Sequence, residues 1–182
     1  MSNSRLELYT PRLALRDLML ADWRTIYALS QEPQVTCYQA WLRLANEEEA
    51  YQWVQSAIDH NQRVPRAAYN LAIVTQHNAN VIGWLGWGHP SDPTKGDYDF
   101  GYALLPRAWG NGYMTEALQA AVTFMFESLG AQRIFGECVE RNQGSARVME
   151  KAGLQRVAQW YECDAETGVR EKHLRYTKRK YE

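Results

Sequence analysis

The sequence predicts a single α/β domain, in which a mixed, mostly antiparallel and twisted sheet of about seven strands carries helices on both faces. Three observations lead to this fold class. The chain has 182 residues, a length that one compact core can accommodate. Four segments repeat apolar residues with the period of a helix, and short apolar runs bounded by turn residues lie between them. The sequence shows no internal repeat or low-complexity stretch, so residues 1–182 are expected to form one domain.

The first predicted elements are an edge strand and a helix. Residues 6–15 mix alternating apolar side chains with Pro11, which suggests an edge strand interrupted near its middle. Asp22 can then cap a helix over residues 23–30, and this helix should end before Pro33.

A second helix has a clearer beginning, because Asn46 and Glu49 have the spacing of a capping box. From there, apolar side chains recur on one helical face at Ala50, Trp53, Val54, Ala57 and Ile58. This face should pack on the sheet.

The middle of the chain changes to the period of strands. Short apolar runs at residues 69–74, 81–87 and 98–105 are separated by turn-rich segments and predict an antiparallel meander. Helical period returns over residues 113–129, where Gly130 is well placed as the C-terminal stop.

The last third of the chain predicts a strand at residues 134–139 and a short helix at residues 145–152, closed by Gly153. Two more strands should follow, at residues 154–160 and around Leu174 and Tyr176. The strands on either side of the 113–129 helix should be parallel. A connection through a helix requires this arrangement, and the crossover should be right-handed.

The composition disfavours several classes of protein. The net charge of −1 gives no positive field for a polyanion, so a nucleic-acid partner is not expected. No apolar run approaches the roughly 18 residues of a membrane span, and residues 1–5 lack the apolar region of a secretory signal. We therefore expect a soluble, cytoplasmic protein without membrane contact.

The cysteines and histidines lack the spacing of a disulfide framework or a metal site. Cys37, Cys138 and Cys163 are odd in number, widely spaced and without a C-x-x-C pair. The histidines show no ligand spacing either, at His60, His77, His89 and His173. No metal cofactor is therefore expected.

The segment that carries the most chemistry is Arg107-Ala108-Trp109-Gly110-Asn111-Gly112, between a predicted strand and a long predicted helix. In such a loop, unpaired backbone N–H groups and the helix dipole face an anion, and the two glycines let the backbone approach closely. The segment does not match other nucleotide-binding motifs. The dinucleotide-binding motif G-x-G-x-x-G would need a glycine in place of Thr115, and a Walker loop would need Gly-Lys-Ser/Thr. The alternative is a glycine loop that merely turns a strand into a helix.

Two further motifs accompany this loop in a specific order and spacing. The three blocks are Thr10-Pro11-Arg12-Leu13 with Arg16 and Asp17; Gly101-Tyr102 through Arg107-x-x-Gly110-x-Gly112-Tyr113-x-Thr115-Glu116-Ala117; and Asn142-x-x-Ser145-x-x-Val148-x-x-Lys151-x-Gly153. With these blocks, which span nearly the whole chain, the sequence resembles the GCN5-related N-acetyltransferase (GNAT) superfamily. Within it, the chain is similar to the ribosomal-protein N-terminal acetyltransferase (RimJ/RimL-like) branch.

The resemblance implies acetyl-CoA as the co-substrate and assigns residues to it. Leu104 and Leu105 would offer backbone groups to the pantetheine arm as though it were an extra strand. Asn142 would contact the pantetheine from the end of the neighbouring strand. The residues that would surround the pyrophosphate are Arg107, Gly110, Asn111, Gly112, Tyr113 and Met114. The alternatives are a solvated loop arginine at position 107 and a helix cap without ligand contact at position 142.

Acetyl transfer to an amine needs a neutral nucleophile, so the enzyme must bind the amine deprotonated or remove a proton from it. An α-amine with a pKa of about 7.7–8.0 meets this demand more easily than a lysine of about 10.4. The resemblance places a carboxylate that can act through water at Asp99. Asp97 shares its strand face and could perturb its titration. The alternative is that both are solvent-facing edge charges.

The departing thiolate of coenzyme A leaves more easily if a hydroxyl donates a hydrogen bond or a proton to it. Ser145, at the family's serine position near the start of a helix, is the candidate donor, although serine is also a common cap there. Tyr113 and Tyr102 are alternative hydroxyls. A backbone N–H near Leu104 or Leu105 would meet the oxyanion.

The leading hypothesis is an N-acetyltransferase in which a primary amine, the N-terminal α-amine of a protein, attacks acetyl-CoA directly in a ternary complex. The alternatives are an N-acetyltransferase of a small molecule (antibiotic, polyamine or amino acid) and a non-catalytic acyl-CoA-binding regulatory module. The acceptor wall should come from residues 34–46 and 90–97, which include Tyr38, Trp41 and Asp92. The protein is expected to be a monomer or a homodimer.

Overall fold

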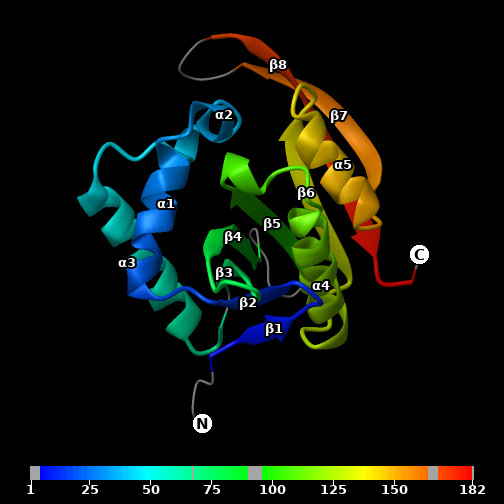
Figure 1. Ribbon diagram of the computed structural model, residues 1–182. Helices are drawn as coiled ribbons and strands as arrows, with labels where there is room; N and C mark the ends of the chain where they lie inside the picture. The colour runs from blue at the N-terminus through cyan, green and yellow to red at the C-terminus, as the bar shows by residue number, and fades with distance from the viewer. Residues whose placement is uncertain (1–4, 67, 90–95, 164–167, 182) are drawn as a thin grey trace.

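The computed structural model describes residues 5–66, 68–89, 96–163 and 168–181. In these residues the chain forms one mixed sheet of eight strands in the order β1-β2-β3-β4-β5-β6-β8-β7. Figure 1 shows α1 and α3 on one face of the sheet and α4 and α5 on the other. The predicted α/β fold is therefore confirmed, with one strand more than expected. None of the described helices is long and apolar enough to cross a membrane.

The extra strand lies at the N-terminal edge of the sheet. The prediction of a single interrupted strand over residues 6–15 is wrong. The segment forms two strands, β1 (Glu7–Tyr9) and β2 (Leu13–Asp17), which pair with each other antiparallel. Pro11 lies in the turn between them, where the Thr10 N–H donates to the Leu13 carbonyl at 2.9 Å. Because proline lacks an N–H for a ladder, it favours reversal of the chain over continuation of the strand.

Helix α1 (Trp23–Ser30) follows a short 3-10 turn, η1 (Leu20–Asp22), and the expected capping role of Asp22 is wrong. The Asp22 carboxylate instead accepts two hydrogen bonds from the Arg16 guanidinium, at 2.7 and 2.9 Å, and one from the Met19 N–H at 2.8 Å. A charge-assisted pair of this kind is stronger than a single cap bond, so the carboxylate turns toward Arg16.

The segment after α1 contains two short elements that the sequence did not predict, α2 (Pro33–Thr36) and η2 (Ala40–Leu42). Pro33 was expected only to follow the end of a helix, but it also begins one, since proline suits the first helical turn. Helix α3 (Glu47–Gln62) has its predicted cap, because the Asn46 side-chain oxygen accepts the Glu49 N–H at 2.9 Å.

The predicted meander is confirmed as β3 (Ala68–Thr75), β4 (Val81–Gly88) and β5 (Asp97–Leu104), paired antiparallel in sequence order. A 3-10 turn, η4 (Pro106–Ala108), then leads into α4 (Tyr113–Glu127) and β6 (Arg133–Val139). As predicted, β5 and β6 are parallel. They pair only from Asp97 with Arg133 to Asp99 with Phe135, and beyond Asp99 the two strands part.

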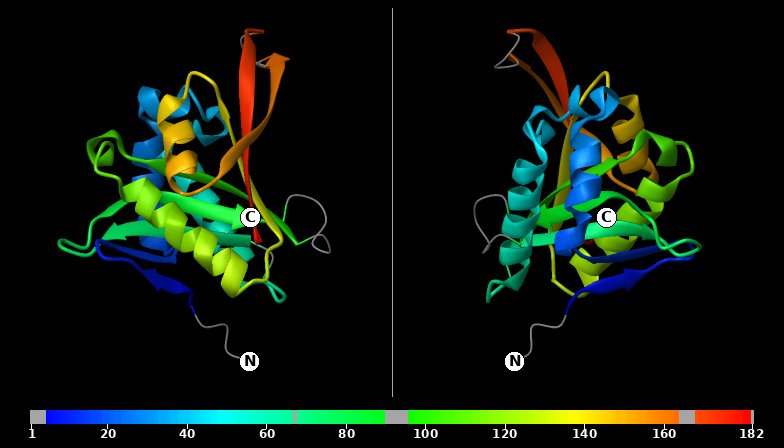
Figure 2. Two further views of the ribbon diagram at one scale, coloured as in Figure 1. Left: turned by 90° about the vertical axis from the view of Figure 1, so that its right-hand side faces the viewer. Right: turned by 60° about the vertical axis from the view of Figure 1, so that its left-hand side comes forward.

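The chain ends with α5 (Gln143–Lys151), β7 (Gln155–Cys163) and β8 (Arg170–Arg179). Strand β8 inserts between β6 and β7, so β7 forms the edge of the sheet. Figure 2 shows the β7–β8 hairpin extending beyond the rest of the molecule.

Two apolar layers fix the sheet between its helices. The layer under α4 and α5 includes Leu15, Leu71, Leu85, Leu118, Met125, Met149 and Tyr176. The layer under α1 and α3 includes Ile26, Leu29, Leu42, Val54, Ala72, Trp84 and Leu105. Successive β5 side chains point into opposite layers, so this strand presents residues to both faces where it parts from β6.

Candidate functional site

The parting of β5 and β6 opens a cleft that consists of two adjoining cavities. The larger has a volume of about 410 Å³ and the smaller about 300 Å³. They share the residues Tyr38, Gln39, Asn142 and Ser145. The other residues of the larger cavity include Tyr102, Ala103, Leu104, Gly110, Gly112, Tyr113 and Met114, and those of the smaller include Trp41, Asp99, Gly101, Phe135, Glu137 and Cys138. Volumes in this range suit small ligands.

The larger cavity ends on the loop that precedes α4. Gly110 and Gly112 have φ angles of +77° and +76°, which residues with a side chain rarely adopt. Glu116 is the first residue of this region whose N–H bonds back into the helix, to the Gly112 carbonyl at 3.1 Å. Within the described chain, the N–H groups of residues 110–115 have no protein partner. Unpaired amides at the positive end of a 15-residue helix form a site for an anion.

Along the open edge of β5, backbone groups of alternate residues point into the cleft. The Gln39 side-chain amide donates to the Tyr102 carbonyl at 2.7 Å, and the Trp109 indole donates to the Leu104 carbonyl at 2.8 Å. Because the N–H and C=O of one strand residue point to the same side, the N–H groups of Tyr102 and Leu104 face the opening as well. This edge can therefore receive an extended polar ligand.

Not all the loop residues singled out from the sequence line the cleft. Leu104, Gly110, Gly112, Tyr113 and Met114 do, whereas Arg107 and Asn111 are exposed and line neither cavity. Leu105 lies apart from them. It is buried under α1 and α3, and its N–H donates to the Ile82 carbonyl at 2.9 Å, so this N–H is not open to a ligand.

Ser145 lies in the first turn of α5, where the two cavities meet. Its hydroxyl is 2.8 Å from the Tyr102 hydroxyl, which also donates to the Ser145 carbonyl at 3.2 Å. Asn142 accepts the Ser145 N–H at 3.0 Å, so it caps α5 as well as lining the cleft. Its helix-capping role and its position at the cleft therefore coexist.

Burial sets the protonation of the groups around Ser145. It raises the pKa of the Tyr102 phenol well above its ordinary value, against the lowering effect of the hydrogen bond with Ser145. Burial also raises the pKa of the Cys138 thiol to about 11. Both groups are therefore protonated at neutral pH, and Tyr102 can stabilise negative charge on Ser145 only as a hydrogen-bond donor.

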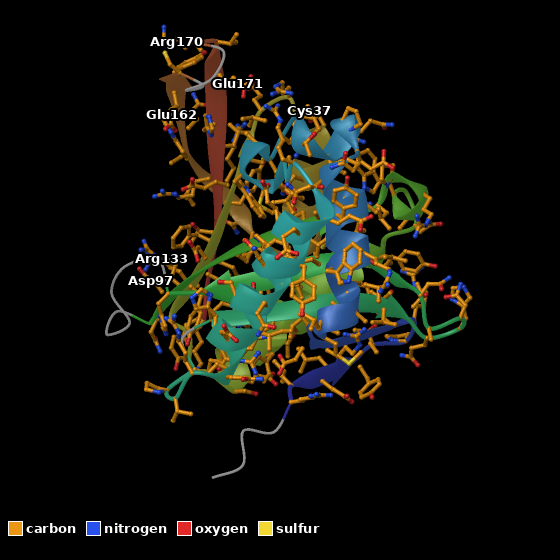
Figure 3. The ribbon with its side chains drawn as sticks, turned by 90° about the vertical axis from the view of Figure 1, so that its left-hand side faces the viewer. Cys37, Asp97, Arg133, Glu162, Arg170 and Glu171 are labelled. Carbon is orange, nitrogen blue, oxygen red and sulfur yellow. The ribbon has the colours of Figure 1, made fainter. Side chains whose placement is uncertain are left out.

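Asp99 lies in the smaller cavity and forms no ion pair within the described residues. Its pKa is raised, chiefly by burial and further by the Glu137 carboxylate, while its backbone hydrogen bond and His89 act in the opposite direction. Asp97 has a different role, because it pairs with Arg133, whose Nε donates to it at 3.2 Å. Figure 3 shows this pair well away from Cys37.

Replacing Asp99 with asparagine is expected to stabilise the fold at neutral pH. The pKa of this carboxyl is higher in the folded chain than in the unfolded chain, so its ionisation lowers stability as the pH rises from the unfolded pKa through the folded pKa, and the full cost is present above the folded pKa. The Asp99→Asn variant should therefore gain about 0.5–2 kcal/mol at pH 7, a usual range for stabilising substitutions. This gain should disappear as the pH falls toward 4. Denaturant unfolding at both pH values measures it, and equal stability of the two chains at pH 7 would contradict it.

The segment of residues 33–42, here called the arm, lies against both sides of the cleft. Gln39 bonds it to β5, and Arg141 bonds it to the β6–α5 turn by donating to the Cys37 carbonyl at 2.8 Å. Arg141 also pairs with Glu171 of β8 at 2.5 Å. Figure 3 shows Cys37 and Glu171 at the same end of the molecule. The arm is thus bonded to β5 and to the β6–α5 turn, where β8 holds the Arg141 side chain through Glu171.

Part of the predicted acceptor wall is on this arm. Tyr38 and Trp41 line the smaller cavity, and Trp41, which is 52% exposed, packs on Trp53 and Trp84 with ring centroids 6.5 and 5.7 Å apart. Residues 90–95, which include Asp92, lie outside the described residues. Among the described side chains, no group of three or more His, Cys, Asp or Glu could hold a metal ion.

Comparison with known proteins agrees with this arrangement. Residues 12–155 match the model of a family described as acetyltransferase (GNAT) domain. A relative from Bacillus subtilis, the uncharacterized N-acetyltransferase YoaA, is 27% identical over 149 residues, which is 82% of each chain.

Two solved structures have the same fold at low sequence identity. The ribosomal L7/L12 α-N-protein acetyltransferase RimL, in complex with coenzyme A, gives a TM-score of 0.84 at 20% identity and covers 96% of this chain and 98% of its own. The microcin C7 self-immunity acetyltransferase MccE, in complex with acetyl-CoA and AMP, gives 0.79 at 18% identity and covers 93% of each chain.

Proposed function

This chain belongs to the acetyltransferase (GNAT) domain family, and on that premise we propose that it transfers the acetyl group of acetyl-CoA to the N-terminal α-amine of a protein. Membership of the family makes it an acetyl-CoA-dependent N-acetyltransferase. One observation carries the proposal most directly. The cleft between β5 and β6 has the free N–H groups of residues 110–115, here called the anion-binding loop, at one end and the unpaired Asp99 carboxylate at the other. Ser145 lies between them.

The residues of the larger cavity fit coenzyme A. The N–H groups of residues 110–114 would hold the diphosphate, because they are unpaired and lie at the start of α4. A side chain at Gly112 would have to adopt an unfavourable φ of +76° beside this site. The pantetheine would lie along the open edge of β5 at Tyr102 and Leu104, in the manner of an added strand.

The residues of the smaller cavity suit proton transfer to and from the reacting groups. Asp99 would take a proton from the incoming amine, through water or directly, because its raised pKa makes it a stronger base than an ordinary aspartate. Ser145 would donate its hydroxyl proton to the departing sulfur. Tyr102, 2.8 Å from the Ser145 hydroxyl, would orient that hydroxyl and stabilise the charge left on it. The Leu104 N–H at the open edge would stabilise the oxyanion.

An α-amine is the acceptor that this site serves best. Among its described residues the site has two carboxylates and no buried histidine or lysine as a base. The Glu137 carboxylate is paired with Arg175, so Asp99 is the carboxylate that is available as a base. A lysine acceptor would carry a penalty of about 4 kcal/mol for deprotonation at neutral pH, whereas an α-amine carries little. The likeness in fold to an α-N-protein acetyltransferase supports the same choice.

A small-molecule amine is the second candidate, and the size of the smaller cavity favours it. A volume of about 300 Å³, bounded by Tyr38 and Trp41 of the arm, is at the low end of the range for ligand pockets. A peptide could place only its first residue or two there. The likeness in fold to the microcin C7 self-immunity acetyltransferase MccE supports this second candidate. Cytoplasmic location and a monomeric or homodimeric state stay predictions.

A screen of acceptor amines tests the proposal. The protein is incubated with acetyl-CoA and with peptides of varied first residue, free amino acids, polyamines or aminoglycosides, while free thiol release is followed and products are identified by mass spectrometry. We expect thiol release that depends on a peptide, with the acetyl group on its α-amine. Transfer to small amines alone would favour the second candidate. Acetyl-CoA binding without turnover on any amine would support a regulatory module instead.

A further inference from the structure

The turn between β1 and β2 contacts the first turn of α4, next to the anion-binding loop (Figure 2). The Arg12 N–H donates to one carboxylate oxygen of Glu116 at 2.9 Å, and its Nε donates to the other at 2.6 Å. Thr10 adds a hydrogen bond from its hydroxyl to the same carboxylate at 2.6 Å. More than a hundred residues separate these partners in the sequence, so the contact ties the N-terminal strands to the loop.

Arg12 also contacts the loop itself. Its Nη1 donates to the Asn111 carbonyl at 2.9 Å, and its guanidinium lies 4.8 Å from the centroid of the Tyr113 ring. Its Nη2 lies 3.6 Å from the point where a Cβ on Gly112 would stand. One side chain therefore fixes the residues on both sides of Gly112.

The charge of Glu116 explains why a cation is needed at this place. Burial alone would raise the pKa of this carboxyl, but the hydrogen bonds from Thr10 and Arg12 and the charge of Arg12 lower it. Glu116 is therefore ionised at neutral pH, in the same helical turn as the amides that face the anion. Without a counter-charge, its field would oppose a bound diphosphate.

We propose that Arg12 is a positioning residue for the diphosphate of coenzyme A. It holds the loop of residues 110–113 in its binding conformation and cancels the charge of Glu116 beside it. This role rests on the proposed function, because it presumes that the loop binds coenzyme A. Stability alone does not account for the pair, since Arg12 is 48% exposed and exposed ion pairs contribute little to stability.

Calorimetric titration of coenzyme A into Arg12→Gln, Arg12→Lys and the native chain tests the proposal. We expect Arg12→Gln to weaken binding about tenfold or more, and Arg12→Lys to weaken it less because the charge remains. In steady-state kinetics, Arg12→Gln should raise the KM for acetyl-CoA by a similar factor. The acceptor KM and the kcat at saturating acetyl-CoA should stay within about twofold. The double variant Arg12→Gln/Glu116→Gln should recover at least threefold of the lost affinity.

Arg133→Gln is the matched control, because Arg133 is 41% exposed and pairs with one carboxylate, that of Asp97, away from the loop. Its affinity for coenzyme A should equal that of the native chain. A folded Arg12→Gln protein with native affinity, or an equal loss in Arg133→Gln, would overturn the positioning role. If the native chain itself bound no coenzyme A, the proposed function would fail instead, so the two failures can be told apart.

Discussion

Replacing Gly112 with aspartate is expected to weaken acetyl-CoA binding about 100-fold, equivalent to about 2.7 kcal/mol of binding free energy. Two effects combine in this variant. The φ of +76° is costly for any residue with a Cβ, so the loop is pushed out of its binding conformation. The new carboxylate also stands at the start of α4, where it competes for the amides that would bind the diphosphate. Titration of acetyl-CoA by calorimetry measures the loss.

Gly130→Asp provides the matched control for this substitution. Gly130 follows α4, has a φ of +70°, and a Cβ built on it would have no neighbour within 4 Å. The control therefore introduces the same side chain and similar strain away from the anion-binding loop. Its affinity for acetyl-CoA should be unchanged. If Gly112→Asp bound acetyl-CoA as well as Gly130→Asp does, the loop would not be the diphosphate site.

Replacing Ser145 with alanine is expected to lower kcat by about 10²- to 10³-fold, within the range that a proton donor contributes. The KM for acetyl-CoA should change little, because the hydroxyl would act on the departing sulfur and not on the bound diphosphate. The fold should survive, since the backbone N–H that Asn142 accepts is still present. Steady-state kinetics with the best acceptor measures both constants.

Ser30→Ala is a suitable control, because the Ser30 hydroxyl lines neither cavity, donates to the Tyr27 carbonyl of its own helix and accepts from the side chain of the adjacent Gln31. Tyr102→Phe adds a second test, since it removes the partner 2.8 Å from the Ser145 hydroxyl and should lower kcat by a smaller factor. Native turnover in Ser145→Ala would exclude Ser145 as the proton donor. Another hydroxyl, such as that of Tyr113, would then be the candidate.

The sequence predicted best the features that are encoded locally. The cap of α3 at Asn46 and the glycine loop before α4 each depend on residues within a few positions of one another. The cap at Asn142 is equally local, but it was expected only as the alternative to a ligand contact. The parallel pairing of β5 and β6 followed from the helix between them. The order of β5, the glycine loop, α4 and a parallel β6 therefore needed only short-range signals and the rule for helical crossovers, whereas the assignment of these residues to coenzyme A came from the family resemblance.

Long-range partners were out of reach of such signals. Tyr102 and Ser145 are 43 residues apart, so their hydrogen bond could not be inferred from spacing, although both residues were candidates. Asp22 carried a capping signal, yet the Arg16 guanidinium, brought beside it by the fold, bound it more strongly. The insertion of β8 between β6 and β7 likewise depends on packing across the whole sheet.

The most direct test of the central claim is the structure of this protein with coenzyme A bound. The diphosphate should lie on the N–H groups of residues 110–114, the pantetheine along β5 at Tyr102 and Leu104, and the sulfur within hydrogen-bonding reach of the Ser145 hydroxyl. A diphosphate bound away from this loop, or a sulfur that does not enter the cleft between β5 and β6, would contradict the account.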